Sequence, residues 1–262
     1  MTDVLILGCG FTGQRVARRF IDRGCRVTAT TRTPAKLASL NQLGVRVITL
    51  DDLAAHLHPG VLVLHSIPPS GPADLLDPLG TAPGRVVYLS TTGVYGSATL
   101  VDASTPVDPQ SDRARPRLAA EERVAAGPWS SLILRPAAIY GPGRGVQESL
   151  PRGAYYSSDN YVSRIHVEDL AAHCEAALLS DLAGAFPVAD EEPCTTREIA
   201  EFCARLLHLP SVPQRAAGAK VRTTSNRRVD GSAIRRALGI TLAYPSYRTG
   251  IPASLITPSV ES

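Results

Sequence analysis

Short, mostly apolar runs alternate with amphipathic stretches through the first half of the chain. The runs indicate strands buried on both faces, and the apolar positions that recur at helical spacing between them indicate helices. The predicted strands cover residues 4–7, 26–30, 45–50, 60–65, 85–89 and 131–134. Because helical segments separate the strands, we expect right-handed crossovers and a parallel sheet with helices on both faces, in strand order 3-2-1-4-5-6.

The pattern changes past residue 140. The stretch 141–160 is rich in Gly, Pro, Ser and Tyr and lacks periodicity, which predicts a loop or lid. We expect residues 1–140 to form one domain and residues 141–262 a small α/β substrate lobe, whose 164–180 helix packs back on the core. Within this lobe we predict a helix over 167–179, a strand over 185–189, and a helix over 195–207 capped by Thr195 or Thr196.

A glycine-rich turn joins the first predicted strand to the first predicted helix. It reads Gly8-Cys9-Gly10-Phe11-Thr12-Gly13, a G-x-G-x-x-G in strand-to-helix context. Gly8 permits a sharp turn, Gly10 leaves room for a pyrophosphate, and Gly13 lets the helix approach the strand. The free N–H groups at the helix start, near Phe11 and Thr12, would face the phosphates. The sequence thus predicts a Rossmann dinucleotide-binding domain; the alternative is a tight turn that binds nothing.

The end of the second predicted strand indicates which dinucleotide binds. An NAD-binding domain carries an acidic residue here for the ribose 2′-hydroxyl, whereas this chain reads Thr30-Thr31-Arg32-Thr33. Arg32, with Thr31 beside it, suits a 2′-phosphate. We therefore predict NADP as the cofactor, with NAD as the alternative if Arg32 is only a solvated surface charge.

Two further loops follow strands at the edge where ligands of such sheets bind. Asp51, after the third strand, would contact the adenine end of the cofactor. Ser66, Ile67 and Pro68, after the fourth strand, would border the nicotinamide half. Either loop could instead cap the helix that follows it.

Several strings along nearly the whole chain resemble the short-chain dehydrogenase/reductase superfamily, in the extended or atypical branch that includes sugar-nucleotide epimerases and dehydratases. They are GCGFTG at 8–13, YLSTTGVYG at 88–96, PQSDRARPRLAAEE at 109–122, LRPAAIYGPGR at 134–144, RIHVEDLA at 164–171 and FPVADEEPCTTREIA at 186–200. The resemblance implies that Pro136 and Ala138 lie on the nicotinamide side of the cofactor. It also implies a homodimer through the helices that carry Arg117 and Val167.

The catalytic motif of this superfamily is incomplete here. The resemblance implies that Thr91, four residues before Tyr95, is the hydroxyl that binds the substrate oxygen. The Y-x-x-x-K motif is replaced, since Arg113 stands at the Tyr position and Arg117 at the Lys position. Arg117 can still hold the cofactor ribose, but Arg113 cannot transfer a proton because its pKa is far above any working pH.

Another group must handle the proton if the protein is an enzyme. Tyr95 lies in the loop that follows the fifth strand and would need a lowered pKa, which Arg113 or Arg117 could supply. Tyrosines can also pack beneath loops with their hydroxyls satisfied, so a structural role for Tyr95 is the alternative. Further candidates with the same alternative are Tyr140, His65 and His166.

Arginines are frequent in the loops expected near the mouth of the site. They are Arg113, Arg115, Arg135, Arg144, Arg164 and Arg228. A guanidinium group binds a carboxylate or phosphate through two hydrogen bonds, so the predicted substrate is a small molecule, anionic or nucleotide-sugar-like. The alternative is a solvated basic rim.

Composition excludes several other classes. The 262 residues are 44% hydrophobic and 19% charged, with a net charge of +3, which is too mild for a nucleic-acid-binding surface. The five cysteines form no C-x-x-C and fit reduced thiols in the cytoplasm. No apolar run reaches membrane-spanning length and no H-E-x-x-H is present. We expect no nucleic acid, membrane or metal partner.

Two functions remain open at this point. The first is an NADP-dependent oxidoreductase or epimerase/dehydratase-like enzyme with Thr91, Tyr95 and Arg117 as a non-standard catalytic set, acting on a carbonyl, alcohol or sugar-nucleotide-like substrate. The second is an NADP-binding sensor or scaffold without turnover, which the missing tyrosine and lysine favour.

Overall fold

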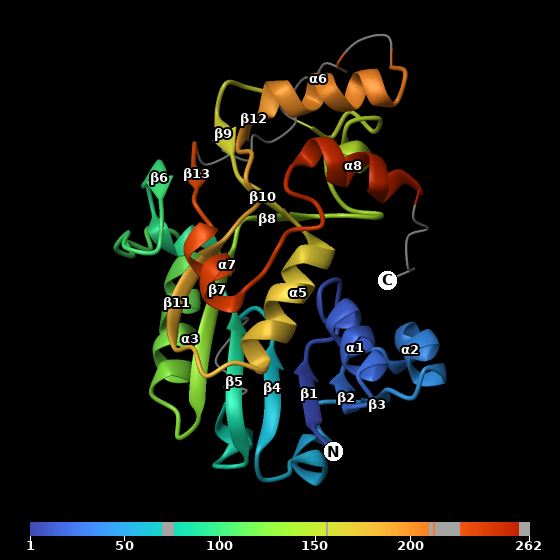
Figure 1. Ribbon diagram of the computed structural model, residues 1–262, viewed down its shortest axis with the longest axis vertical. Helices are drawn as coiled ribbons and strands as arrows, with labels where there is room; N and C mark the ends of the chain where they lie inside the picture. The colour runs from blue at the N-terminus through green and yellow to red at the C-terminus, as the bar shows by residue number, and fades with distance from the viewer. Residues whose placement is uncertain (70–75, 156, 210–211, 213–225, 257–262) are drawn as a thin grey trace.

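A seven-stranded parallel sheet forms the centre of the molecule (Figure 1), in the order β11-β7-β5-β4-β1-β2-β3. The computed structural model describes residues 1–69, 76–155, 157–209, 212 and 226–256. The strands of this sheet are β1 Asp3–Leu7, β2 Arg26–Thr30, β3 Arg46–Ile48, β4 Val61–His65, β5 Pro83–Leu89, β7 Ser130–Pro136 and β11 Gly184–Val188. The fold is therefore α/β, a Rossmann doubly wound sheet.

The order predicted for the first six strands is confirmed, because β3-β2-β1-β4-β5-β7 corresponds to 3-2-1-4-5-6. The seventh strand, β11, is the strand expected over 185–189 in the second lobe. It pairs in parallel with β7, with Ala185 opposite Ile133, so the main sheet extends to residues beyond position 140.

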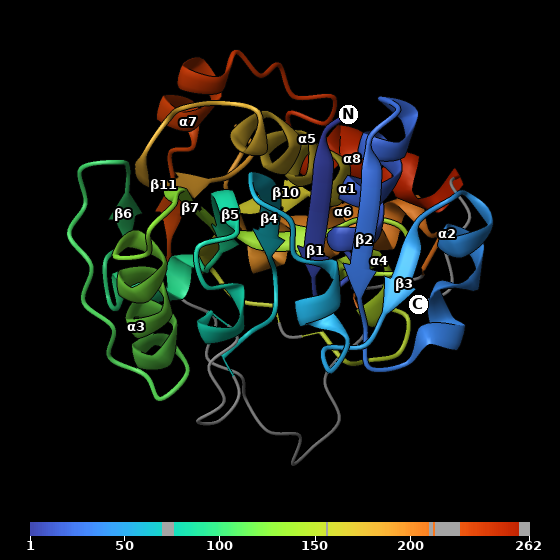
Figure 2. The same ribbon diagram turned by 90° about the horizontal axis from the view of Figure 1, so that it is seen from below.

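Helices cover both faces of the sheet. The helices of the described chain are α1 Gly13–Asp22, α2 Ala38–Gln42, α3 Ala114–Ala125, α4 Val146–Ser149, α5 Val167–Leu178, α6 Thr196–Leu206, α7 Ser232–Leu238 and α8 Tyr247–Ile256, with the 3-10 helices η1 Pro34–Leu37, η2 Leu53–His56, η3 Asp77–Leu79 and η4 Thr92–Tyr95. Of these, α1, α3 and α5 pack on the main sheet. Successive side chains of β1 point to opposite faces of the sheet and pack in different hydrophobic cores. Ile6 packs with α1 and α5, and Leu5 packs in the core that contains Val124 of α3. Figure 2 shows α3 and α5 on opposite sides of the strands.

Among the described residues, no helix has the length and apolar character needed to cross a bilayer.

Small sheets and short helices form a second layer of structure above the main sheet in Figure 1. The pairs are β8 Ala138–Tyr140 with β10 Arg164–His166, β9 Tyr161–Val162 with β12 Cys194–Thr195, and β6 Leu100–Val101 with β13 Arg228–Val229. Their apolar core brings α4, α6 and α8 together around Tyr140, Ile199 and Tyr247. This layer reaches the glycine turn after β1, because Gly141 packs against Phe11.

Local capping explains where two helices of this second layer begin. Thr195 caps α6, and its side chain and that of Glu198 bond each other's backbone N–H at 3.1 and 2.7 Å, as a capping box requires. His166 caps α5 by accepting from Glu168 N at 3.3 Å. The helices predicted over 167–179 and 195–207 are thus confirmed, with their ends within a residue or two.

Candidate nucleotide-binding and active site

The three glycines of the turn after β1 are required for different reasons. Gly8 has φ +82°, and a Cβ there would lie 2.5 Å from Ile67 Cγ1. A Cβ on Gly13 would lie 3.0 Å from the carbonyl oxygen of Gly8, so α1 can approach β1 only without a side chain. A Cβ on Gly10 would have no heavy atom within 4 Å. Packing therefore explains Gly8 and Gly13, whereas Gly10 borders open space.

The backbone N–H groups that directly follow Gly10 have no acceptor among the described residues. Gly10 N donates to Gly8 O and Gln14 N to Gly10 O, at 2.8 and 3.0 Å. In the part of the chain that the structure describes, no acceptor bonds the N–H of Phe11 or Thr12, and the Thr12 side chain makes no cap to α1. Free N–H groups at a helix start bind anions readily. The residues present thus fit the pyrophosphate of a dinucleotide.

The ends of β2 and β3 place the predicted 2′-phosphate and adenine residues side by side, because these strands are neighbours in the sheet. Thr31 is half-buried, and its Oγ1 accepts from Thr33 N at 3.2 Å. Arg32 and Asp51 are exposed. Within the described residues the Arg32 guanidinium has neither a hydrogen-bond nor an ion-pair partner, so its charge is available to a ligand.

The loop after β4 supports the glycine turn directly. Ser66 Oγ donates to the carbonyl oxygens of Gly8 and Leu7, at 2.6 and 3.1 Å. Ile67 packs against Gly8, and Pro68 is exposed. The structure therefore brings the predicted residues of the first and fourth strands into contact, at the switch point between β1 and β4.

Thr91 and Arg117 both lie near the carboxyl end of β5. Thr91 begins η4, where its Oγ1 accepts from Gly93 N at 3.1 Å, and its hydroxyl proton remains available to a ligand. Arg117, in α3, donates from Nη1 to Leu89 O at 2.9 Å. Both residues are half-buried, so each has atoms that a ligand can reach.

Two residues with implied cofactor contacts lie at the end of the neighbouring strand β7. Pro136 is buried and stands opposite Val188 of β11. Ala138, at the start of β8, is exposed. Of the two, Ala138 offers a surface to a ligand in this structure.

Tyr95 does not fit the role of proton donor. Its side chain is buried, at 1% exposure, and its hydroxyl accepts from Arg135 Nη1 at 3.2 Å. Burial raises its pKa above the ordinary value, although the hydrogen bond and charge of Arg135 act to lower it. Proton transfer by Tyr95 would need a lowered pKa and access to substrate, whereas desolvation outweighs the nearby guanidinium here. The structural alternative, a tyrosine packed beneath the loop with its hydroxyl satisfied, fits these observations better.

A buried network that the sequence did not reveal lies beneath this loop. Glu121 of α3 is 2% exposed and binds Arg135 of β7, with Oε2 2.6 Å from Nη2. Ser90 Oγ also donates to Glu121. The available signal was an acidic residue on the face of α3 that packs on the sheet, but its partner is 14 residues further along. Arg135 is therefore an internal group and does not line a mouth.

The other three proton-transfer candidates are also internal. Burial, with a smaller contribution from the charge of Arg117, lowers the pKa of His65 to about 4. The Tyr140 hydroxyl donates to Ser246 O at 3.2 Å, and burial raises its pKa. His166 caps α5, and burial lowers its pKa to about 4. His65 Nδ1 also accepts from Ile67 N at 3.3 Å, so each of the three has a structural role.

The six loop arginines do not form a single cluster. Arg164 is buried, with Nη1 2.9 Å from Val162 O. Arg115 pairs with Asp112, and Arg228 stacks on Tyr161 with Cζ 3.6 Å from the ring centroid. The two that remain, both exposed, are Arg113 and Arg144.

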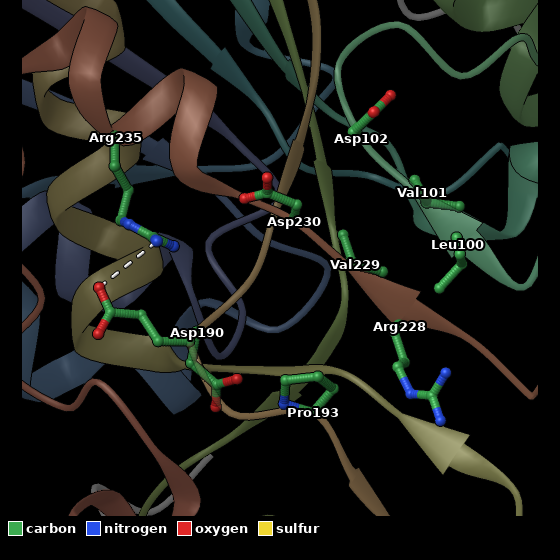
Figure 3. Close-up of a pocket in the computed structure, with 10 residues that line it drawn as sticks. Leu100, Val101, Asp102, Asp190, Pro193, Arg228, Val229, Asp230 and Arg235 are labelled. Atoms are coloured by element: carbon green, nitrogen blue, oxygen red, sulfur yellow. Dashed lines mark ion pairs between the residues drawn. The ribbon is translucent and has the colours of Figure 1, made fainter.

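A separate cavity of about 410 Å³ opens between β6, β13 and the loop after β11 (Figure 3). Of the sequence-predicted residues it contains Arg228. Asp190 in its wall is 2% exposed, neither carboxylate oxygen is hydrogen-bonded by a described residue, and burial raises its pKa to about 8. Over the described ranges, no group of three or more His, Cys, Asp or Glu side chains is arranged to hold a metal ion.

Comparison with known proteins agrees with the glycine-turn site. Residues 3–92 match the family described as NADP oxidoreductase, coenzyme F420-dependent. A short-chain dehydrogenase/reductase from Pestalotiopsis microspora is 46% identical over 54 residues, which is 20% of this chain and 20% of that protein. The match thus spans about a fifth of the curated relative.

Solved structures resemble the chain over its whole length. A conserved protein of unknown function from Silicibacter pomeroyi is 30% identical, with full coverage of both chains and a TM-score of 0.83. A protein assigned as an NAD-dependent epimerase/dehydratase from Methylobacillus flagellatus is 26% identical over 97% of each chain, with a TM-score of 0.77. MoeE5, solved with UDP-glucose and NAD, shares the fold at 22% identity over 97% of each chain, with a TM-score of 0.79.

Fold, glycine turn and comparisons together define a Rossmann-type protein with an NAD(P)-binding oxidoreductase/epimerase-like fold. More specifically, the chain is similar over nearly its whole length to a protein assigned as an NAD-dependent epimerase/dehydratase, and over 54 residues to a short-chain dehydrogenase/reductase.

Proposed function

We propose that the protein is an NADP-dependent oxidoreductase or epimerase-like enzyme. The observation that carries this proposal is that the N–H groups of Phe11 and Thr12, next to the open face of Gly10, have no partner among the residues that the structure describes. Residues 1–140 would hold most of the cofactor, and residues 141–262 would cover the substrate.

The preference for NADP depends on the end of β2. Arg32 is exposed and unpaired among the described residues, with the Thr31 hydroxyl beside it and no acidic residue at the end of β2 itself. A charge-assisted hydrogen bond between guanidinium and phosphate is worth roughly 1.5 to 3 kcal/mol. Asp51 would contact the adenine end from the neighbouring strand.

When bound, the nicotinamide supplies or accepts a hydride. Thr91 would donate its hydroxyl proton in a hydrogen bond to the reacting oxygen of a carbonyl or alcohol. Arg117 would bind the ribose hydroxyls, as its reach to Leu89 O at the end of β5 allows. Because Tyr95 is buried, we propose that water at Thr91 carries the proton. Residues that would line the nicotinamide half are Ser66, Ile67, Pro68, Pro136 and Ala138.

The substrate we propose is a small anionic or nucleotide-sugar-like carbonyl or alcohol. MoeE5, whose fold this chain shares, was solved with UDP-glucose, which supports a nucleotide-sugar-like compound. Arg113 is an exposed loop arginine through which an anionic group of the substrate could be bound.

A second candidate function is a cofactor-binding sensor without turnover. It is favoured by one observation: each titratable candidate for proton transfer is buried in the described structure, namely Tyr95, Tyr140, His65 and His166. Such a protein would bind NADPH tightly, and no substrate would cause the bound NADPH to be oxidised.

Fluorescence titration of NADPH and NADH tests the cofactor proposal. We expect NADPH to bind more tightly than NADH. Arg32→Ala should weaken the binding of NADPH about tenfold or more and leave the affinity for NADH unchanged. Arg205→Ala, at an exposed arginine of α6, is the matched control and should change neither. Equal affinities, or tighter NADH, would overturn the preference for NADP.

Single-turnover oxidation of bound NADPH by a panel of carbonyl and sugar-nucleotide substrates tests the chemistry. Thr91→Val should lower the rate at least about tenfold without changing the Kd for NADPH, because it removes one hydrogen bond to the reacting oxygen. Tight binding without oxidation by any substrate would exclude the enzyme and support the sensor.

A further inference from the structure

The ring of Phe11 lies between two guanidinium groups. The Cζ atom of Arg15 is 4.3 Å from the ring centroid and that of Arg144 is 5.1 Å from it. Arg15 belongs to the first turn of α1, whereas Arg144 belongs to the turn between β8 and α4. Two segments distant in sequence therefore place positive charge beside the glycine turn.

The two arginines differ in their partners. Arg15 is 11% exposed; its Nε bonds Glu168 Oε1 at 2.8 Å and its Nη1 donates to Phe11 O at 2.7 Å. Its charge is thus compensated, and it fixes the backbone of the turn. Arg144 is exposed, and within the described ranges its side chain has no hydrogen-bond acceptor and no carboxylate partner. Partial burial lowers its pKa, but a guanidinium remains charged at any working pH.

The backbone that carries Arg144 is held firmly. Gly141 and Arg144 exchange backbone hydrogen bonds at 2.8 and 3.0 Å, and Gly143 between them has φ +73°. Gln147 Nε2 donates to both carbonyl oxygens of this pair, at 2.9 and 3.2 Å. A Cβ on Gly141 would lie 3.3 Å from Phe11 Cζ, so the turn packs directly on the glycine turn.

We infer that Arg144 binds the pyrophosphate of the dinucleotide, together with the backbone N–H groups of Phe11 and Thr12. This inference rests on the proposed cofactor site. A charged guanidinium with no carboxylate partner among the described residues, on a firmly held turn and 5.1 Å from the ring of Phe11, matches the double negative charge of a diphosphate. The second layer of the fold thereby takes part in cofactor binding.

The pyrophosphate is common to NADP and NAD, whereas the 2′-phosphate is not. Arg144→Met should therefore lower the affinities for NADPH and NADH by the same factor, about tenfold, in titrations of the full-length protein. Arg32→Ala should lower the affinity for NADPH alone. Arg152→Met, at an exposed arginine just after α4, is the matched control and should leave both affinities unchanged.

Salt dependence separates a charge contact from packing on Phe11. Salt screens the attraction between guanidinium and phosphate, so the affinity of Arg144→Met should fall less steeply with ionic strength than that of the parent protein. Arg144→Lys should retain most of the affinity and the steep salt dependence, because it keeps the charge.

Three outcomes would count against these proposals, at different levels. Parent-like affinity of Arg144→Met for both cofactors would overturn the role of Arg144. A loss of affinity with unchanged salt dependence would assign Arg144 to packing and overturn the charge contact. Failure of the parent protein to bind either cofactor would instead overturn the proposed function itself.

Discussion

Arg135 of β7 and Glu121 of α3 form a buried ion pair, with Nη2 2.6 Å from Oε2 and side chains only 10% and 3% exposed. Burial acts to lower the pKa of Arg135, but its hydrogen bonds to Glu121 and Tyr95 outweigh this effect and raise it. Ser90 also donates to Glu121. The pair thus joins α3, β7 and the loop that carries Thr91.

Removal of one partner should be costly. Glu121→Gln leaves a buried guanidinium without its counter-charge, and we expect a loss of about 3 to 5 kcal/mol in the free energy of unfolding, measured by urea denaturation. Asp159→Asn, which removes the partner of Arg197 from an exposed pair, should cost less than about 1 kcal/mol. Equal losses for the two variants would mean that burial does not control the strength of these pairs.

Gly10 and Gly13 should respond differently to alanine. Gly13→Ala places a Cβ 3.0 Å from a backbone oxygen, so we expect a loss of about 1 to 3 kcal/mol in the free energy of unfolding. Gly10→Ala meets no atom within 4 Å and should fold with unchanged stability, yet bind NADPH about tenfold or more weakly. Thermal denaturation and cofactor titration check both variants. Undiminished NADPH binding by Gly10→Ala would argue against a pyrophosphate at this position.

The pKa of Asp190 predicts a pH dependence of stability. Its folded pKa is raised to about 8 from 3.8, so between these values the folded protein retains a proton that the unfolded chain has lost. Stability should therefore fall as pH rises from about 4 to about 8, by at most about 1.4 kcal/mol per pH unit from this group. Asp190→Asn removes this contribution and should flatten the profile.

Urea denaturation at several pH values between 5 and 8 measures this profile. Asp22→Asn, at an exposed carboxylate of α1, is the control and should keep the slope of the parent protein. If Asp190→Asn and the parent protein show the same slope, the Asp190 carboxylate is already ionised in the folded protein.

Local sequence patterns are sufficient to predict the order of the strands in the sheet and the position of the glycine turn. Buried strands separated by helices restrict the topology strongly, and the spacing of Gly8, Gly10 and Gly13 has a direct steric meaning. The strand over 185–189 could be predicted, but its placement beside β7 could not. An apolar run shows that a strand exists without showing which strand it pairs with.

Burial of polar groups could not be predicted in this way. Tyr95 and Arg135 were interpreted as groups near a ligand because they follow strand ends, yet each is enclosed by segments distant in sequence. Arg164 similarly bonds Cys194 Sγ at 3.2 Å, across 30 positions. Arg144 is exposed, and its turn lies beside Phe11 because Gly141 packs against that ring. The sequence does not show this packing.

The position of β11 at the margin of the main sheet has a consequence for synthesis. Until residue 188 has left the ribosome, the backbone N–H and C=O groups on the β11 side of β7 are unpaired and can bond a strand of another chain. A nascent or prematurely terminated chain is therefore exposed to misassembly during this interval, and chaperones would be needed most there.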